Sequence, residues 1–320
     1  MNALLCQHAP PDGTLLNVAI ILVNYKQPAK TLQCLDSLKT LQGLSAQAAP
    51  AIIVVDNASG DNSISLFNAA QLNPQGLPFQ LLQNHENLGF SGGVNTGLQV
   101  VLKNPDIHYV WLLNNDTTVA PDTLAVLLNE SCRTGGIVGS QLRYPEGRFQ
   151  QAGMVINLWR AAAKGLPEPS RVAPYPVDAI SGASMLIPVT VLKKIGLLDA
   201  HYFLYFEDIA YCLKARRAGF QVTLAPASIV FHVESASTGK GSLLASYYSW
   251  RNRLLLVEQF GSPLQKITSL LYTQFRLFRS RLKAWLPGGF SKSRFLTVHQ
   301  LAVSDYRARV SGPCPHVLTL

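Results

Sequence analysis

Polar side chains follow each of four apolar segments in the first part of the chain. The apolar segments are 17–23, 51–55, 79–82 and 109–113, and each has the length and composition of a buried strand. In sequence, the first segment is followed by Asn24 and Tyr25, the second by Asp56 and Asn57, the third by Asn87 and Gly89, and the fourth by Asn114, Asn115 and Asp116. One such cluster is an ordinary turn, but ligands of open parallel sheets bind beyond the carboxyl ends of the strands. Four clusters at four strand ends therefore predict a shared ligand site.

The carboxylates in these clusters suit a nucleotide and a hard cation. Asp56 can accept a hydrogen bond from a nucleobase N–H group or a ribose hydroxyl. Asp116 can hold Mg²⁺ together with the phosphates of a nucleotide, because this ion takes oxygen ligands and is usually bound by one or two carboxylates. The alternative for residues 114–116 is an Asx turn without a ligand.

A second group of reactive residues lies in the later part of the chain. Glu207 and Asp208 follow the aromatic run 202–206, and His232 follows the strand-like segment 228–231. Desolvation beside aromatic rings raises the pKa of a carboxyl toward the range of a general base. The alternative is that both acids favour a helix N-terminus. His232 can complete a metal site as a neutral imidazole, although a single histidine is more often structural.

The elements that position these residues alternate between strand and helix patterns. Helical spacing is expected for 28–41, 61–70, 91–102, 121–132 and 206–219, and further strands for 178–187 and 221–224. The alternation predicts an α/β, Rossmann-like fold with a mostly parallel sheet and flanking helices. Segment 144–176, rich in Pro and Gly, is expected to form loops and short strands. We expect a catalytic domain over 15–240 and a C-terminal helical, basic amphipathic segment over 241–320.

The motifs of several nucleotide-binding classes are absent. The segment after the first strand, 23–30, lacks the glycines of a dinucleotide fingerprint, and no P-loop occurs. The five cysteines are far apart and contain no CxxC pair, which argues against a disulfide framework or a zinc site and indicates a reducing compartment. Residues 1–14 show no secretory signal, and no apolar run is long enough to span a membrane. We therefore expect a cytoplasmic protein.

The net charge of +9 comes mainly from one C-terminal segment. Residues 261–300 hold seven basic residues and no acidic residue. Apolar residues recur every three or four positions between 267 and 285, as in an amphipathic helix. Such a helix can lie on an anionic membrane, here the inner face of the cell membrane, or pack on the catalytic domain or another subunit. No nucleic-acid reader motif accompanies the charge, so no nucleic-acid partner is expected.

An ordered set of motifs resembles one enzyme family. The motifs span 23–27, 54–63, 84–97, 111–119, 180–187, 203–220 and 231–238. They resemble the family 2 glycosyltransferases of the GT-A fold, especially the bacterial rhamnosyltransferase-like branch. The resemblance implies an inverting, metal-dependent glycosyltransferase that moves a sugar from a dTDP- or UDP-sugar donor. The implied acceptor is a hydroxyl of a glycan or a lipid-linked glycan in surface polysaccharide synthesis.

The resemblance also implies a role for each matching residue. Asp208 is the general base, with Glu207 adjacent, and Asp116 with His232 binds Mg²⁺ or Mn²⁺. The donor is bound by Asn24, Tyr25, Asp56, Asn57, Asn87, Gly89, Asn95, Asn114 and Asn115. Ala210 and Pro188 stand where many relatives carry an acid and an arginine, which leaves fine specificity open.

Two other functions stay open at this point. A nucleotidyltransferase would also use an α/β fold, a metal and a nucleotide, but it usually carries a Gly-rich loop with Arg or Lys after the first strand, and segment 23–30 has no such loop. A non-catalytic nucleotide-sugar-binding protein would not need Asp56, Asp116 and Asp208 together, and all three are present.

Overall fold

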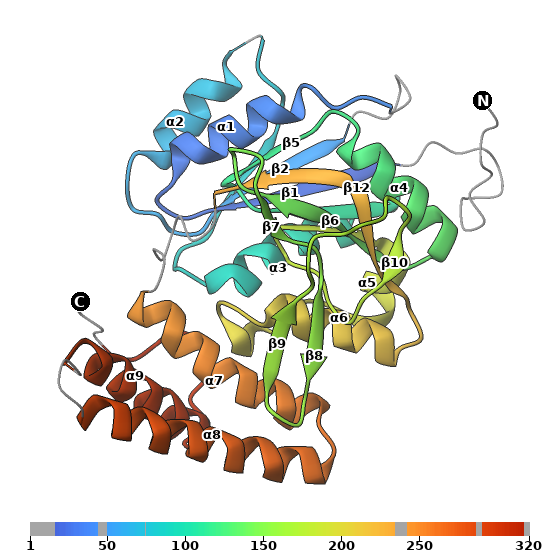
Figure 1. Cartoon of the computed structure of the whole chain (residues 1–320). Helices are drawn as coiled ribbons and strands as arrows, with labels where there is room; N and C mark the ends of the chain where they lie inside the picture. Colours follow the sequence, from blue (N-terminus) through green and yellow to red (C-terminus); the bar gives the residue numbers. More distant parts are fainter. Residues whose placement is uncertain (1–16, 44–49, 74, 234–241, 286–289, 317–320) are drawn as a thin grey trace.

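The computed structural model describes residues 17–43, 50–73, 75–233, 242–285 and 290–316 (Figure 1). The N-terminal stretch 1–14, expected to hold no signal, lies outside these residues, as does most of the motif 231–238. The molecule consists of a central sheet with helices on both faces and three C-terminal helices beside it.

The four strands predicted in the first part of the chain form a parallel group. They are β1 (Val18–Asn24), β2 (Ala51–Asp56), β3 (Gln80–Gln83) and β4 (Tyr109–Leu113). β1 pairs in parallel with β2 and β4, and β2 with β3. Their carboxyl ends therefore share one edge of the sheet, as the sequence predicts.

Beyond β4 the sheet becomes mixed. β11 (Ser184–Pro188) runs antiparallel between β4 and β6 (Ile137–Arg143), and β6 pairs in parallel with β12 (Val222–His232). The order along the sheet is β10-β12-β6-β11-β4-β1-β2-β3. β12 joins the two segments expected at 221–224 and 228–231 into one strand, with a register shift between Ala225 and Ile229. The strand expected over 178–187 forms only from Ser184 onward.

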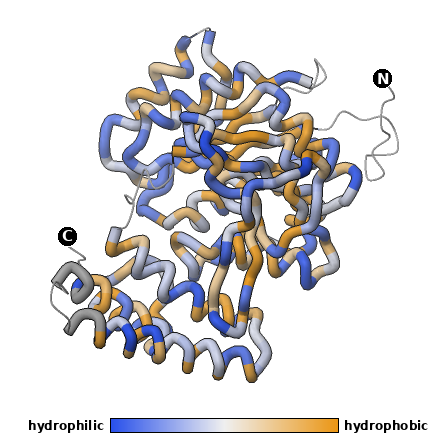
Figure 2. Tube along the Cα trace, in the orientation of Figure 1, coloured by the Kyte–Doolittle hydropathy of each residue, from blue (hydrophilic) through white to orange (hydrophobic). Residues whose placement is uncertain are grey.

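Helices cover both faces of the sheet because its buried strands are apolar on both sides. One face packs against α1 (Pro28–Leu38), α2 (Ser63–Gln71) and α4 (Thr123–Thr134). The other packs against α3 (Gly89–Leu102), α5 (Val189–Ile195) and α6 (Glu207–Arg217). Ile20 and Leu22 enter the first core, while Ala19 and Ile21 enter the second. Apolar residues accordingly concentrate along the sheet and the inner helix faces (Figure 2).

Several short strands lie beside the long strands of the sheet. β5 (Thr117–Val119) pairs with the end of β12, and β7 (Phe149–Gln151) pairs with β6. β8 (Met154–Asn157) and β9 (Ala162–Gly165) form a separate hairpin, and β10 (Tyr175–Pro176) lies at the sheet edge. Segment 144–176 therefore has the loops and short strands that its composition predicts.

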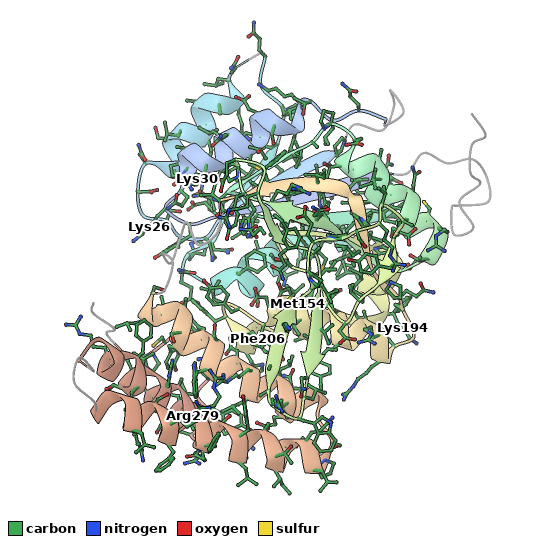
Figure 3. The ribbon with its side chains drawn as sticks, viewed as in Figure 1. Lys26, Lys30, Met154, Lys194, Phe206 and Arg279 are labelled. Atoms are coloured by element: carbon green, nitrogen blue, oxygen red, sulfur yellow. The ribbon has the colours of Figure 1, made fainter. Side chains whose placement is uncertain are left out.

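Three helices complete the chain: α7 (Leu243–Phe260), α8 (Pro263–Trp285) and α9 (Phe290–Arg307). They share a core that also takes in Ala161 of the β8–β9 hairpin and Phe203, Leu204 and Tyr205 of the loop before α6. Met154 and Phe206 lie between the sheet and these helices (Figure 3). Among the described residues, no helix is both long enough and apolar enough to cross a bilayer.

Candidate active site

A cavity of about 730 Å³ opens at the carboxyl edge of the parallel strands. Its walls come from the strand ends, the β8–β9 hairpin, the loop 203–206 and helices α7 and α8. Most of the predicted site residues line it together: Tyr25, Asn57, Asn87, Gly89, Asn114, Asn115, Asp116, Glu207, Asp208 and His232. This volume lies in the range of small-molecule binding sites.

One end of the cavity brings the predicted metal ligands together. β5 pairs with β12 so that Thr117 opposes His232, which places His232 beside Asp116. The Nε2 atom of His232 lies 3.3 Å from Asp116 Oδ1 and 3.4 Å from Asn114 Nδ2. Burial acts to raise the pKa of Asp116, but the hydrogen bond and charge of His232, together with Lys30, outweigh it and lower that pKa. Asp116 is therefore an anion at neutral pH.

The donor atoms at this end fit a hard divalent cation. Asn114 Oδ1 is buried there without a hydrogen-bond partner, which is costly unless a ligand satisfies it. Among the described residues, no third His, Cys, Asp or Glu joins Asp116 and His232. Remaining ligands would be the Asn114 oxygen and oxygens of a bound diphosphate, the usual arrangement for Mg²⁺ at nucleotide sites.

The acid pair lies at the start of α6, in the middle of the cavity wall. The Asp208 carboxylate accepts hydrogen bonds from the Gly182 amide (2.9 Å) and the Ile209 amide (2.7 Å). Burial raises the pKa of Asp208, and these amides oppose the shift. Glu207 is more deeply buried, and its Oε2 atom has no hydrogen-bond partner. Burial and then the charge of Asp208 raise the pKa of Glu207 well above its ordinary value. The partly accessible Asp208 is thus the better proton acceptor.

A strained loop places this acid pair. Phe203, Tyr205 and Phe206 have φ values of 56°, 66° and 75°, a region that non-glycine residues rarely adopt. Asn252 of α7 holds the loop, because its buried Nδ2 donates to the carbonyls of Tyr202, Leu204 and Tyr205 at 2.7–2.9 Å. The position of Asp208 therefore depends on a side chain from the C-terminal helices.

A glycine is required at position 89 because the backbone there closely approaches the same loop. Its φ is +70°, and a Cβ atom there would lie 2.2 Å from the carbonyl oxygen of Phe203. The next amide, that of Phe90, donates to this oxygen at 2.7 Å. The glycine after the third strand thus lets α3 approach the loop, in addition to lining the cavity.

Three predicted donor residues do not line the cavity. Asn24 and Asp56 are buried behind it, where Asn24 Nδ2 donates to Asp56 Oδ1 at 2.8 Å and Ser59 Oγ also bonds that carboxylate. Asn95 makes a reciprocal pair with the backbone of Leu198, at 2.9 and 3.0 Å. Asn24 and Asp56 thus support the strand ends, and Asn95 supports the backbone at Leu198. Their direct contact with a donor stays a prediction.

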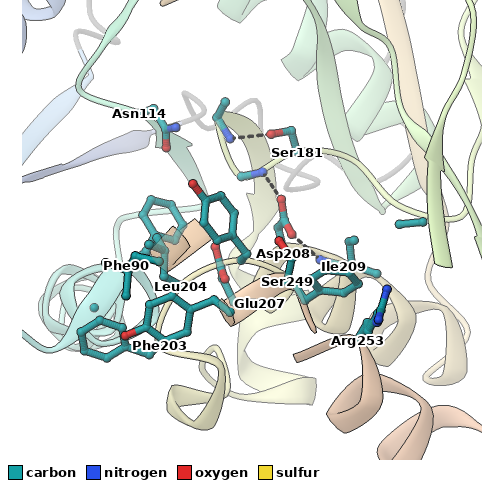
Figure 4. A pocket seen from close by; sticks show the side chains of 18 of the residues that line it. Phe90, Asn114, Ser181, Phe203, Leu204, Glu207, Asp208, Ile209, Ser249 and Arg253 are labelled. Carbon is teal, nitrogen blue, oxygen red and sulfur yellow. Dashed lines mark hydrogen bonds between the residues drawn. The ribbon is translucent and has the colours of Figure 1, made fainter. Parts of the chain in front are cut away.

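Several lining residues are absent from the sequence-based prediction. Met154 and residues 161–163 come from the hairpin, and Tyr248, Trp250, Arg253 and Arg276 come from α7 and α8. The sequence signal in α7 is the run Arg251–Arg253, which lies between the aromatic residues 247–250 and the apolar residues 254–257. In Figure 4, Asp208 lies between Asn114 and Arg253. Arg276 contacts the same Trp250 ring as Arg253, so Arg253 and Arg276 belong to the end of the cavity away from the predicted cation ligands.

Replacement of Glu207 by Gln tests the electrostatics of the acid pair. A carboxyl whose pKa is raised on folding lowers the unfolding free energy increasingly as the pH rises above its unfolded pKa, reaches its full effect above the raised pKa, and has no such effect below the unfolded pKa. Glu207→Gln should therefore raise the unfolding free energy at pH 8, on the order of 1–3 kcal/mol, and leave it nearly unchanged near pH 4. Denaturant titrations at both pH values measure this.

A matched control is Glu130→Gln, because Glu130 is also buried but is paired with Arg133 at 2.7 and 2.9 Å. That change should not stabilise the protein at pH 8. Equal behaviour of the two variants would show that Glu207 carries no uncompensated charge.

The sequence matches known proteins over most of its length. A family model described as "Glycosyltransferase like family 2" matches residues 16–253. A low-salt glycan biosynthesis hexosyltransferase, Agl10, of Haloferax volcanii is 24% identical over 278 residues, covering 82% of each chain. An N-acetylglucosaminyl-diphospho-decaprenol L-rhamnosyltransferase of Mycobacterium tuberculosis is 25% identical over 232 residues, 64% of this chain and 74% of that one. An uncharacterised Sinorhizobium fredii protein is 37% identical over 142 residues, and the match spans only 16% of its length.

Solved structures show the same fold at low sequence identity. GalNAc-T7, solved with UDP, GalNAc and Mn²⁺, superposes with a TM-score of 0.62 at 16% identity, covering 93% of this chain and 57% of that one. The mannosyltransferase PcManGT of Pyrobaculum calidifontis, solved with GDP-Man and Mn²⁺, gives 0.58 at 14% identity, covering 93% and 91%. The predicted fold class and family are confirmed. Because the family model covers well over half of its residues, this chain belongs to glycosyltransferase family 2 and has the GT-A fold.

Proposed function

We propose that this enzyme is an inverting, metal-dependent glycosyltransferase. Its donor is a dTDP- or UDP-sugar, with rhamnose as the first candidate for the sugar. Its acceptor is a hydroxyl of a glycan or lipid-linked glycan in surface polysaccharide synthesis. The observation that carries the proposal is that Asp208 lines the same cavity as the proposed cation ligands and lies between Asn114 and Arg253 in Figure 4. The names of the two longest-matching relatives support a hexose or rhamnose donor and a lipid-linked acceptor.

The residues of the chain divide the reaction between them. Asn114, Asp116 and His232 would hold Mg²⁺ or Mn²⁺, which when bound stabilises negative charge on the departing diphosphate. Asp208 accepts the proton of the acceptor hydroxyl, and the two backbone amides on its oxygens fix its orientation. The hydroxyl oxygen attacks the anomeric carbon from the face opposite the leaving group, so the configuration inverts.

The catalytic part of the chain takes in α7 in this proposal. A boundary near residue 240 was expected from the sequence, but Tyr248, Trp250 and Arg253 of α7 line the cavity. A nucleotidyltransferase or a non-catalytic sugar-nucleotide binder is not favoured, since the matched relatives with named activities are glycosyltransferases.

Asp208→Asn is the direct test of the base. A positioned general base contributes roughly 10²–10⁴-fold in rate, so turnover should fall by about that factor while the donor dissociation constant stays the same. Release of nucleoside diphosphate is measured across dTDP- and UDP-sugars with Mn²⁺, Mg²⁺ or EDTA, and EDTA should abolish it. Asp106→Asn, at an exposed position, serves as the control. Normal turnover of Asp208→Asn would contradict the assignment.

Asn252→Ala tests how the acid pair is positioned. Loss of the three hydrogen bonds frees the strained loop, and a small displacement of the base costs about 10²-fold in rate. We expect kcat to fall by roughly that factor, with the KM for the donor nearly unchanged, in assays well below the melting temperature of each variant. Asn68→Ala, on the exposed face of α2, should leave kcat unaltered. If kcat per folded molecule stays at the wild-type value, Asn252 has a structural role only.

An exposed apolar stripe on α8 supports membrane contact. It consists of six side chains that are 51–65% exposed: Leu264, Ile267, Leu271, Phe275, Phe278 and Leu282. At about 100° per residue they fall within an arc of roughly 80°. Arg279 and Arg281, both exposed, flank the stripe on opposite sides, and segment 261–300 has no acidic residue. We propose that this face binds the anionic inner surface of the cell membrane.

Vesicle flotation checks the membrane proposal. The full chain should float with vesicles of phosphatidylcholine and phosphatidylglycerol and much less with phosphatidylcholine alone. Replacing Leu271, Phe275 and Phe278 by Gln should abolish flotation. The matched control replaces Leu66, Leu72 and Leu102, which are also exposed but lie on α2 and α3 or next to them. If the α8 variant floats like wild type, or if it only loses self-association in sedimentation, the stripe is not a membrane contact.

A further inference from the structure

Two arginines stand side by side at the end of the cavity away from the cation ligands. Arg253 comes from α7 and Arg276 from α8, and both line the cavity. The guanidinium carbon of Arg253 lies 3.6 Å, and that of Arg276 4.6 Å, from the centre of the Trp250 ring. The shared aromatic ring fixes both side chains in one place.

Arg253 is buried but lacks the hydrogen bonds that a buried guanidinium needs. Only 6% of the residue is exposed, and its Nε and Nη2 atoms have no hydrogen-bond partner. Burial, and then the charge of Arg276, lower the pKa of Arg253 to about 9. The side chain therefore remains mostly charged at neutral pH. An unpaired buried charge is strongly unfavourable unless an anion is bound.

Although the ring of Trp250 contacts them, the described surroundings offer these charges no anionic partner. No described carboxylate pairs with either arginine, and the nearby His299, stacked on Trp250 at 3.9 Å, does not act as an anion. Burial and the two arginines lower the pKa of His299 to about 3, so it stays neutral. The cavity thus ends in a region of positive potential, where the Nε and Nη2 donors of Arg253 have no acceptor among the described residues.

We infer that Arg253 and Arg276 form a binding site for a phosphate group of the acceptor substrate. Guanidinium groups match phosphate oxygens with paired, charge-assisted hydrogen bonds; both arginines line the cavity, and the Nε and Nη2 atoms of Arg253 are buried without a described partner. The anion belongs to the acceptor because Asp208 separates this site from the cation ligands that would hold the donor diphosphate (Figure 4). This last step rests on the proposed function; the anion site itself does not.

The test measures binding of geranyl diphosphate to the full chain in EDTA by calorimetry, with geraniol and inorganic pyrophosphate as reference probes. Geranyl diphosphate and pyrophosphate should bind, and geraniol should not. Arg253→Gln and Arg276→Gln should each weaken diphosphate binding about 10- to 100-fold. Arg307→Gln should leave it unchanged, because Arg307 is exposed at the end of α9 and does not line the cavity. Arg253→Lys keeps the positive charge but not the planar guanidinium group, so it should bind diphosphate more tightly than Arg253→Gln and less tightly than wild type.

A second titration identifies the source of the phosphate. UDP and dTDP are titrated with Mn²⁺ into the same variants, and their affinities should stay within about twofold of wild type. Equal weakening of nucleotide and geranyl diphosphate binding would assign the arginines to the donor and overturn the inference. Unchanged geranyl diphosphate binding in a folded Arg276→Gln variant would overturn it as well, even if Arg253→Gln fails to fold. If the phosphate site behaves as expected but no sugar donor is consumed, the proposed function fails and the anion site stands.

Discussion

The hydrogen bonds from Asn252 to the loop before α6 are the constraint on which the rest of the site depends. Three left-handed residues in a span of four cost about 1–3 kcal/mol each, so the loop does not hold its shape alone. One side-chain amide from α7 bonds three of its carbonyls, and Gly89 lets α3 close on the other side. The acid pair at the start of α6 is therefore positioned by α7 and α3, which supply neither the proposed base nor the proposed cation ligands.

The sequence predicts the strands because buried parallel strands are continuous apolar runs. It predicts their shared edge because the polar residues that follow parallel strands lie together at the carboxyl edge of the sheet. It does not predict which of those polar residues face the cavity. Asn24 and Asp56 satisfy each other behind the strand ends, whereas Asn114 keeps an unsatisfied oxygen at the cavity. Residue types at a strand end do not distinguish these outcomes, since both place an amide or a carboxylate in the same position.

The arginine pair and Asn252 illustrate a different limit. They lie in helices whose apolar periodicity indicates that one face is buried. The periodicity does not indicate which other element packs against that face. Arg253 packs on Trp250 within its own helix, while Arg276 reaches the same ring from α8. Only the packing of three helices against the hairpin and the loop 203–206 brings the two arginines to the cavity and Asn252 to the carbonyls of the loop. Tertiary contact, rather than local pattern, decides their role.

The two faces of α8 connect the cavity with the proposed membrane surface. Arg276 lines the cavity, while its neighbours Phe275 and Phe278 are more than half exposed on the opposite side. An α-helix with its side chains is about 10–12 Å across, so a phosphate bound by the arginines would lie within roughly one helix diameter of a membrane under α8. The sugar attached to that phosphate would then extend away from the membrane, in the direction of Asp208.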